Sequence, residues 1–180
     1  MMNFSIQPRL ENERAILYPL QQSDFEALYE VASDPLVWEQ HPNKTRWQRP
    51  VFETYFDGAM KSGGAFRIVD KATGRTAGSS RFYDYDPQQN SILIGYTFYS
   101  REFWGSGLNP SVKHLMLSWI FQYVDKVIFH VGAVNTRSQI AMTRLGARKV
   151  KEEEVAYFGE PSRLNCIYEI NKADWQAQHP

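Results

Sequence analysis

The chain has 180 residues and a mass of 20.9 kDa, which is the usual size of one domain, so we expect residues 1–180 to form a single domain. Twenty Lys and Arg residues balance twenty Asp and Glu residues, and this lack of net positive charge argues against a nucleic-acid or membrane partner. The single cysteine, Cys166, excludes an intrachain disulfide and a Cys-x-x-C metal or redox site, which fits a cytoplasmic location.

Residues 1–10 lack the apolar run of a signal peptide. No segment reaches the ~18 consecutive apolar residues that a membrane-spanning helix requires, so we expect a soluble protein.

The first predicted element is a short strand over residues 15–20. A helix is predicted to follow it, with Ser23 as the N-cap and Glu26 completing a capping box.

A second helix is predicted from Pro50 to Gly63, because apolar residues recur at helical spacing between them. The segment 38–47 before it mixes aromatic, charged and amide residues without a period and is predicted to be a loop. Three strand-like stretches with short connections come next, which indicates an antiparallel meander. These stretches span residues 65–70, 76–85 and 91–99.

The second half of the chain alternates helices and strands. A helix that opens near Leu108, with Asn109 as N-cap, carries an apolar stripe that includes Leu115 and Trp119. The remaining elements are a buried strand over 127–131, a helix over 136–145, and strands over 149–158 and 164–170. The predicted architecture is α/β (α+β), with a mixed, mostly antiparallel sheet of seven strands and four helices.

The strand over 91–99 leads through Gly105-Ser106-Gly107 into a helix, and such a junction can bind phosphate. The glycines let the backbone approach an anion closely, and the helix dipole adds partial positive charge there. The turn lacks the ending of a Walker P-loop and the third glycine of a dinucleotide fingerprint. Gly-x-Gly also occurs where a strand simply turns tightly into a helix, so this structural interpretation stays open.

A second segment, Asn135 to Ala147, has the pattern Asn-x-x-Ser-x-x-Ala-x-x-x-Leu-Gly. Together with Trp-Gly-Ser-Gly after an Ile-Gly-Tyr strand, it resembles the GNAT acetyltransferases, specifically the ribosomal-protein-alanine acetyltransferase (RimJ/RimL-like) branch. The resemblance covers nearly the whole chain and implies the GNAT fold. It also implies an N-acetyltransferase that moves an acetyl group from acetyl-CoA to a primary amine, either a protein N-terminus or a small molecule.

The resemblance implies that the pantetheine arm of CoA enters a gap where strand 91–99 splays from strand 127–131. The amide of Asn135 is expected to bond the arm, and the Ser138 hydroxyl to stabilise or protonate the departing thiolate, so both are predicted catalytic residues. The cofactor-binding residues that the resemblance implies are Phe98, Tyr99, Arg101, Phe103, Trp104, Gly105, Ser106, Gly107, Leu108, Asn109, Asn135 and Ser138.

Four positions depart from the family pattern. Glu102 stands where many GNATs carry Gln or Arg, and Pro110 removes an amide and a hydroxyl that could contact phosphate. Leu93 replaces the glutamate that many relatives use as base, and Met142 replaces a tyrosine that many use as acid. The sequence therefore assigns no base. These replacements also leave open an alternative function, a catalytically weak acyl-CoA-binding regulatory or interaction protein on the same fold.

An α-amine has a reference pKa of about 7.7–8.0, so a useful fraction is neutral near pH 7 and needs only a weak proton acceptor. This favours peptide N-termini over lysine as acceptors. Two tryptophans beside charged groups in segment 38–47 are costly to leave without a partner, which indicates a substrate-facing loop. The predicted substrate-binding residues are Trp38, Glu39, Arg46, Trp47, Tyr83 and Tyr96.

The four histidines, at positions 41, 114, 130 and 179, contain no i, i+4 pair, so we expect no metal site. They are interpreted as structural or surface groups. Cys166 lies in an apolar strand without an activating neighbour and is interpreted as an inert thiol. The sequence leaves the oligomeric state open between a monomer and a homodimer.

Overall fold

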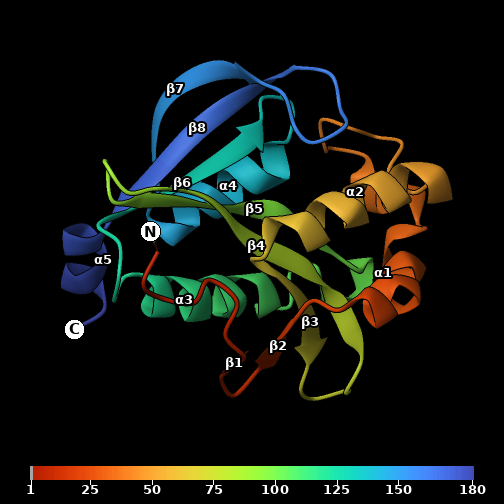
Figure 1. Ribbon diagram of the computed structural model, residues 1–180, viewed down its shortest axis with the longest axis horizontal. Coiled ribbons are helices and arrows are strands. Elements are labelled where there is room, and N and C mark those ends of the chain that lie inside the picture. Colours follow the sequence, from red (N-terminus) through yellow and green to blue (C-terminus); the bar gives the residue numbers. More distant parts are fainter. Residues whose placement is uncertain (1) are drawn as a thin grey trace.

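The computed structural model describes residues 2–180, in which eight strands form one sheet in the order β1-β2-β3-β4-β5-β6-β8-β7 (Figure 1). The strands are β1 (Leu10–Glu11), β2 (Ala15–Pro19), β3 (Ala65–Asp70), β4 (Thr76–Asp86), β5 (Ser91–Tyr99), β6 (Lys126–Gly132), β7 (Arg148–Val155) and β8 (Arg163–Asn171). The α-helices are α1 (Phe25–Ala32), α2 (Arg49–Ser62), α3 (Leu108–Ile120), α4 (Thr136–Leu145) and α5 (Lys172–Gln178). Only β5 and β6 pair in parallel, among the strands of residues 2–180. The predicted α/β class and mostly antiparallel sheet are confirmed.

Two short elements add to the seven strands and four helices predicted from the sequence. β1 has two residues, too few to show a period, and it forms because Leu10 and Glu11 pair with β2. α5 buries only Trp175, so its sequence carries no apolar stripe. Both elements are therefore fixed by tertiary contacts rather than by a local pattern.

The helices cover the two faces of the sheet, and each face has its own core (Figure 1). On the α2 face, Phe52 and Phe56 of α2 pack in one cluster with Phe98 of β5. On the α3 face, helices α3, α4 and α5 pack in a second cluster that includes Ile92 and Ile94 of β5. Successive side chains of a strand point to opposite faces, so β5 contributes to both cores.

The buried side of α3 agrees only in part with its predicted apolar stripe, of which Val112, Met116 and Ile120 are buried. Leu115 and Trp119 are only partly buried, whereas Lys113 and Leu117 are buried. The helix is capped by Gly107 in a left-handed conformation, with φ 84°, so Asn109 is not the N-cap. A lysine thus faces the protein interior at a position that the stripe left to solvent.

The start of α1 also differs from the prediction. A 3₁₀ turn, Gln22–Asp24, precedes the helix, so Ser23 does not cap it. The reciprocal contact joins Gln21 and Asp24 instead, with the Gln21 N–H donating to Asp24 Oδ2 at 2.9 Å. Gln21 is the last extended residue before the chain turns, with φ −120° and ψ 156°, which points its N–H toward that carboxylate.

β5 changes course halfway along its length. Against β4, Ser79 pairs with Phe98 and Arg81 with Gly95, so β5 holds one extra residue there, and this is a β-bulge. Tyr96 in the bulge has a positive φ of 53°. Against β6, pairing extends only over Ser91–Leu93 with Lys126–Ile128. Beyond that point the two strands part, as the resemblance implied.

Candidate active site

A cavity of about 950 Å³ occupies the gap between the parted strands. Its walls come from β5 after Ile94, β6 after Phe129, the N-terminal turns of α3 and α4, and part of segment 38–47. Residues from both faces of the sheet line it. Lys113 and Met142 lie on the α3 face, whereas Tyr83 and His130 lie on the α2 face. The cavity therefore connects two sides of the sheet through its opening.

The turn before α3 has the properties of an anion site. Gly105 has φ 66°, and a Cβ added there would meet no atom within 4 Å. The Ser106 and Leu108 N–H groups are used within the turn, donating to Phe103 O and Ser106 Oγ, both at 3.3 Å. Within residues 2–180, the N–H groups of Gly105 and Gly107 donate to no acceptor. These free donors at a helix start suit a phosphate group.

Arg137 of α4 crosses toward this turn. Its guanidinium carbon lies 3.7 Å from the centre of the Trp104 ring, and both residues line the cavity. Burial lowers the pKa of Arg137, and Glu39 partly opposes the shift. The Arg137 N–H donates to Gln40 Oε1 at 3.1 Å, so segment 38–47 contacts the start of α4. A cation is thus held beside the free amide groups of the glycine turn.

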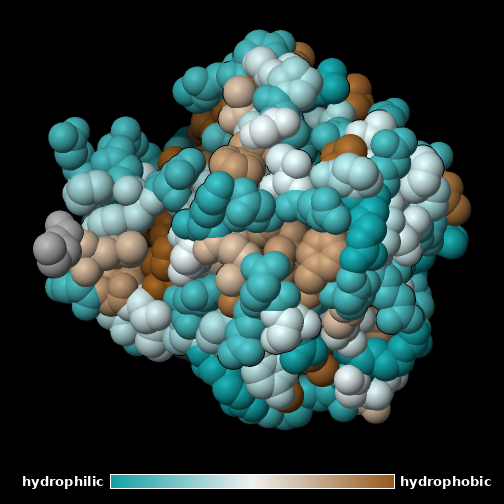
Figure 2. All heavy atoms as spheres, turned by 45° about the vertical axis from the view of Figure 1, so that its right-hand side comes forward, coloured by the Kyte–Doolittle hydropathy of each residue, from teal (hydrophilic) through white to brown (hydrophobic). Residues whose placement is uncertain are grey.

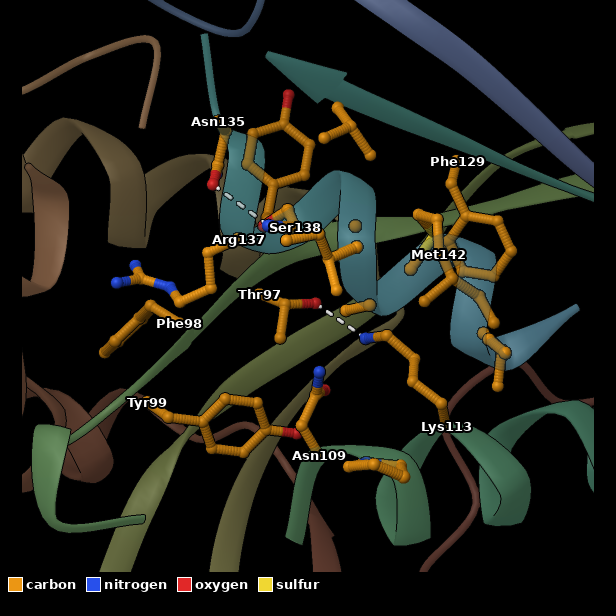
Figure 3. Close-up of a pocket in the computed structure, with 18 of the residues that line it drawn as sticks. Thr97, Phe98, Tyr99, Asn109, Lys113, Phe129, Asn135, Arg137, Ser138 and Met142 are labelled. Carbon is orange, nitrogen blue, oxygen red and sulfur yellow. Dashed lines mark hydrogen bonds between the residues drawn. The ribbon is translucent and has the colours of Figure 1, made fainter. Parts of the chain in front are cut away.

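Asn135 and Ser138 lie together at the start of α4, and both line the cavity (Figure 3). Asn135 is the N-cap, and its Oδ1 accepts the Ser138 N–H at 3.1 Å. The amide oxygen is therefore used in holding the helix, which leaves the Asn135 NH₂ group for a ligand. The Ser138 hydroxyl makes no hydrogen bond to any of residues 2–180.

A polar cluster lies under the bulge on the α3 face. Lys113 is 4% exposed, and its Nζ donates to Thr97 Oγ1 at 2.8 Å and Ser80 Oγ at 3.2 Å (Figure 3). Burial lowers the pKa of Lys113 to about 7. In Figure 3 the Tyr99 hydroxyl points toward Asn109, and both the Tyr99 oxygen and Asn109 Oδ1 are buried without partners in residues 2–180. Such unpaired groups favour binding a polar ligand.

Aromatic residues line the cavity on the α2 face. The Tyr96 ring lies 5.0 Å from that of Tyr83 and 5.1 Å from that of Tyr157, which is itself 6.4 Å from His130. Figure 2, which brings the right-hand side of Figure 1 forward, shows hydrophobic residues in a band bordered by hydrophilic ones. Arg46 also lines this part, and its buried guanidinium pairs with Glu160 Oε1 at 2.8 Å. This end of the cavity can hold a partly apolar group.

Most of the predicted site residues meet in this cavity. The expected CoA-binding residues that line it are Phe98, Tyr99, Phe103, Trp104, Gly105, Gly107, Asn109, Asn135 and Ser138, and the expected acceptor residues that line it are Arg46, Tyr83 and Tyr96. The other predicted residues lie outside the lining: Arg101, Ser106, Leu108, Trp38, Glu39 and Trp47.

Each of these outside residues has another environment. Leu108 and Trp38 are fully buried in the cores, and the Trp38 indole N–H donates to Ala32 O at 2.8 Å. Arg101 is paired with Asp34. Trp47 is 37% exposed, and its carbonyl accepts the Tyr29 hydroxyl. The Trp38 side chain therefore finds its partners within the protein, whereas the Trp47 side chain is partly exposed and its contact with an acceptor stays a prediction. Glu39 is exposed, and Ser106 Oγ donates to Phe103 O within the turn.

The lining residues that the sequence did not indicate include five with polar side chains: Thr97, Lys113, His130, Arg137 and Tyr157. Lys113 had a detectable signal, because Met116 and Leu117 follow it at helical spacing and mark its side of α3 as buried. Arg137 lies inside the Asn-x-x-Ser pattern, at a position that the pattern leaves unspecified. Tyr157 falls in the predicted strand 149–158, but the strand ends at Val155, so the Tyr157 side chain lines the cavity from a loop.

The structure contains no cluster of three or more His, Cys, Asp and Glu side chains able to hold a metal ion within residues 2–180. In the same part of the chain, no helix has the length and apolar character needed to cross a membrane.

A family model described as an acetyltransferase (GNAT) domain matches residues 14–148. Among solved structures, a GCN5-related N-acetyltransferase from Brucella melitensis is 21% identical with a TM-score of 0.81, covering 97% of this chain and 86% of that one. A Vibrio cholerae protein, provisionally a ribosomal-protein-serine acetyltransferase, is 13% identical with a TM-score of 0.72 and coverages of 93% and 99%.

A spermidine N-acetyltransferase from Vibrio cholerae, solved with CoA and spermine, is 13% identical with a TM-score of 0.69 and coverages of 92% and 99%. At these identities the structural likeness establishes a shared fold, and the family match extends over most of the chain. Together with the parted strands and the glycine turn, these findings show that the chain belongs to the GNAT acetyltransferase family.

Proposed function

We propose that this chain is an N-acetyltransferase that transfers an acetyl group from acetyl-CoA to a primary amine, and that residues 1–180 form its single catalytic domain. The observation that carries the proposal is the cavity between β5 and β6, which joins the glycine turn on one face of the sheet to the aromatic wall on the other. A donor and an acceptor entering from opposite faces would meet within the parted strands.

The residues present fit coenzyme A. Gly105 leaves open space where any other residue would carry a Cβ, and the Gly105 and Gly107 N–H groups are unused within residues 2–180. We assign the pyrophosphate to this turn, with Arg137 as a nearby cation. The buried, unpaired Tyr99 hydroxyl and Asn109 Oδ1, which line the same cavity, supply further polar contacts.

Acetyl-CoA supplies a thioester whose carbonyl carbon is attacked by the amine nitrogen, with cleavage of the C–S bond and release of CoA thiol. The Asn135 NH₂ group binds the pantetheine, since the amide oxygen is used in capping α4. The Ser138 hydroxyl stabilises or protonates the thiolate, which gains charge only as it leaves. Arg46, Tyr83 and Tyr96 contact the acceptor on the α2 face.

The acceptor class is the open part of the proposal. The Vibrio cholerae relatives are named for a ribosomal protein and for spermidine, so both protein N-termini and small amines are represented among similar folds. We retain the RimJ/RimL-like branch and a protein N-terminus as the first candidate. A cytoplasmic location is retained with it, supported by the buried free thiol of Cys166.

A thiol-release assay with acetyl-CoA tests the proposal. The acceptor panel contains peptides with N-terminal Ser or Ala, spermine, free amino acids and an aminoglycoside. We expect CoA release that depends on one acceptor class, with the acetylated product identified by mass spectrometry. If calorimetry detects acetyl-CoA binding but no acceptor is turned over, the alternative function, an acyl-CoA-binding regulatory protein, is favoured. This alternative rests on Leu93 and Met142, which replace the usual base and acid of the family.

A further inference from the structure

The cavity contains no carboxylate. Within residues 2–180, its lining includes neither Asp nor Glu. The amine nitrogen must nevertheless lose a proton when it forms the amide, and this proton needs an acceptor. The phenols cannot serve, because burial raises the pKa of Tyr83, Tyr96, Tyr99 and Tyr157 above its ordinary value of 10. Lys113 lies on the donor side and directs its Nζ at two hydroxyl groups. Among the side chains that line the cavity, the histidines are therefore the remaining candidates for the proton acceptor.

Two of the four histidines lie away from the reacting groups. His114 of α3 and His179 after α5 pack against each other, with ring centres 5.0 Å apart. His179 also stacks on Trp175 at 3.8 Å, which places this pair at the α5 end of the cavity. The acceptor side retains His41 from segment 38–47 and His130 from β6.

His41 is poorly suited to accept a proton. Its pKa is lowered to about 3, first by burial and then by the positive charges of Arg46 and Arg137. Its ring packs edge-on against Trp38, with centres 4.9 Å apart. An imidazole between two guanidinium groups cannot readily become an imidazolium.

His130 stands on β6 two residues beyond the last β5–β6 pair, Leu93 with Ile128, so it flanks the opening in the sheet. Its neighbours Phe129 and Val131 belong to the core of the α3 face, and alternation along the strand turns His130 to the α2 face. Nδ1 is buried without a partner in residues 2–180, whereas Nε2 is not among the buried unpaired atoms, and the residue lines the cavity.

The charges around His130 are balanced. β7 places Glu153 and Lys151 near it, β4 contributes Asp84, and the β8 residue opposite, Ile167, is uncharged. Burial lowers the pKa of His130 from its ordinary 6.5, while both carboxylates act to raise it and Lys151 to lower it. The imidazole is therefore neutral at pH 7 and has carboxylates near enough to support the charged form.

We propose that His130 is the general base of acetyl transfer, receiving at Nε2 the proton that the amine nitrogen loses. The neutral amine nitrogen bonds to the carbonyl carbon as the C–S bond breaks, and the nitrogen loses one of its two protons to His130. The departing sulfur takes a proton from the Ser138 hydroxyl and leaves as CoA thiol. The imidazolium gives its proton to solvent and Ser138 regains one from solvent, so the net transfer is one proton from nitrogen to sulfur. This inference rests on the proposed function, and it explains how the chain could act with Leu93 at the position of the usual base.

The test compares wild type with His130→Gln, using whichever acceptor of the panel is turned over fastest. We expect kcat at pH 7 to fall about 10²- to 10⁴-fold, the usual contribution of a general base, with acetyl-CoA affinity unchanged. In the wild type, kcat should fall at acidic pH as His130, whose pKa lies below 6.5, becomes protonated. This acidic limb of the kcat–pH profile should be absent from His130→Gln. His41→Gln is the matched control and should keep that limb.

Thermal unfolding and acetyl-CoA calorimetry establish that His130→Gln is folded. Added imidazole should restore part of the activity of a second variant, His130→Ala. A folded His130→Gln protein with wild-type kcat and an unchanged acidic limb would overturn the role of His130 alone. Wild-type protein that binds acetyl-CoA but turns over no acceptor would overturn the proposed function, and the inference with it.

Discussion

Lys113 is the most unusual single residue of the interior, because a lysine ammonium is costly to bury without a carboxylate. Its partners are two neutral hydroxyls, Ser80 and Thr97. With a pKa near 7 in the folded chain and near 10.5 in the unfolded chain, the unfolded state binds more protons between these values. The free energy of unfolding should therefore rise with pH over this interval, since each pKa unit corresponds to about 1.4 kcal/mol.

This predicts that Lys113→Met increases the free energy of unfolding at pH 7 and flattens its rise between pH 7 and 10. Urea unfolding at several pH values measures both effects. The exposed Lys44, which forms no ion pair within residues 2–180, gives the control Lys44→Met. If Lys113→Met keeps the wild-type slope while remaining folded, the ammonium is not desolvated as the structure indicates.

Ser138 gives a second prediction at this scale. Its hydroxyl is free of protein partners and meets charge that develops only as the thiolate leaves. Ser138→Ala should therefore lower kcat about ten- to a thousandfold and change the KM for acetyl-CoA little. Steady-state kinetics at saturating acceptor separate the two parameters. A wild-type kcat in Ser138→Ala would mean that water or the amine itself handles the proton.

At the scale of elements, the start of α4 combines a structural and a binding role in one side chain. Asn135 uses Oδ1 to cap the helix and has only its NH₂ group for a ligand. Asn135→Ala should lose about 1 kcal/mol of stability, as for other N-caps, and also raise the KM for acetyl-CoA. Asn135→Asp keeps the capping oxygen and loses the donor.

The two variants thus separate the roles. Asn135→Asp should retain near-wild-type stability in thermal unfolding while raising the KM for acetyl-CoA as much as Asn135→Ala does, or more, because it adds negative charge. Equal KM values for Asn135→Asp and wild type would show that the amide acts only as a cap. Kinetics and unfolding on the same preparations make the comparison.

The glycine turn can be tested with an unusually close control. Gly105 and Gly63 both have left-handed backbone, with φ 66° and 64°, and both have open space around an added Cβ. Asn tolerates this conformation better than most residues, so Gly105→Asn and Gly63→Asn should cost similar, small amounts of stability. Of these two glycines, only Gly105 lines the cavity.

We therefore expect Gly105→Asn to weaken acetyl-CoA binding at least tenfold in calorimetry, and Gly63→Asn to leave it unaltered, because a side chain at 105 displaces phosphate from the backbone amides. Gly107→Val is a less clear test, since a branched side chain at φ 84° is strained and its Cβ would meet Arg14 Nη1 at 3.1 Å. Unchanged binding in folded Gly105→Asn would remove the turn from the site.

The elements were largely predictable because their signals are local. Gly63 and Gly146 end α2 and α4 where the sequence indicates, and the boundaries of β3 and β5 agree with the alternation and turn patterns. The partial exposure of Leu115 and Trp119 was not predictable from the stripe of α3, because these two residues are as apolar as those that are buried. The face of the sheet on which the His130 side chain lies depends on the order of the strands, and a local sequence pattern does not determine that order.

The same distinction holds for the candidate site. Residues carried by a contiguous motif, such as Gly105, Asn135 and Ser138, line the cavity as expected. The acceptor wall is assembled from separate strands and a loop, so Tyr157 and His130 could not be associated with it from sequence. Trp38 illustrates the opposite case, because its aromatic ring packs in the core of the α2 face and does not line the cavity.

At the scale of the whole molecule, the cavity separates two halves of the sheet that are joined by few β5–β6 contacts. A ligand that touches the starts of both α3 and α4 should therefore stabilise the complete fold. We expect acetyl-CoA at 100 times its Kd to add about 2.7 kcal/mol to the free energy of unfolding, visible as a rise in Tm. Gly105→Asn should show a much smaller rise at the same concentration, and equal rises would place the ligand elsewhere.

The order of strands also bears on how this protein avoids aggregation. Open strand edges are templates for pairing between molecules, and this sheet has outer edges at β1 and β7. β1 has only two residues, and β7 is exposed along nearly its whole length and consists mostly of charged residues, among them lysines and glutamates. Two further unpaired edges, those of β5 and β6 beyond Leu93 and Ile128, lie on either side of the cavity. The opening that would admit a substrate thus places these unpaired backbone groups between two strands of the same chain rather than at an outer edge of the sheet.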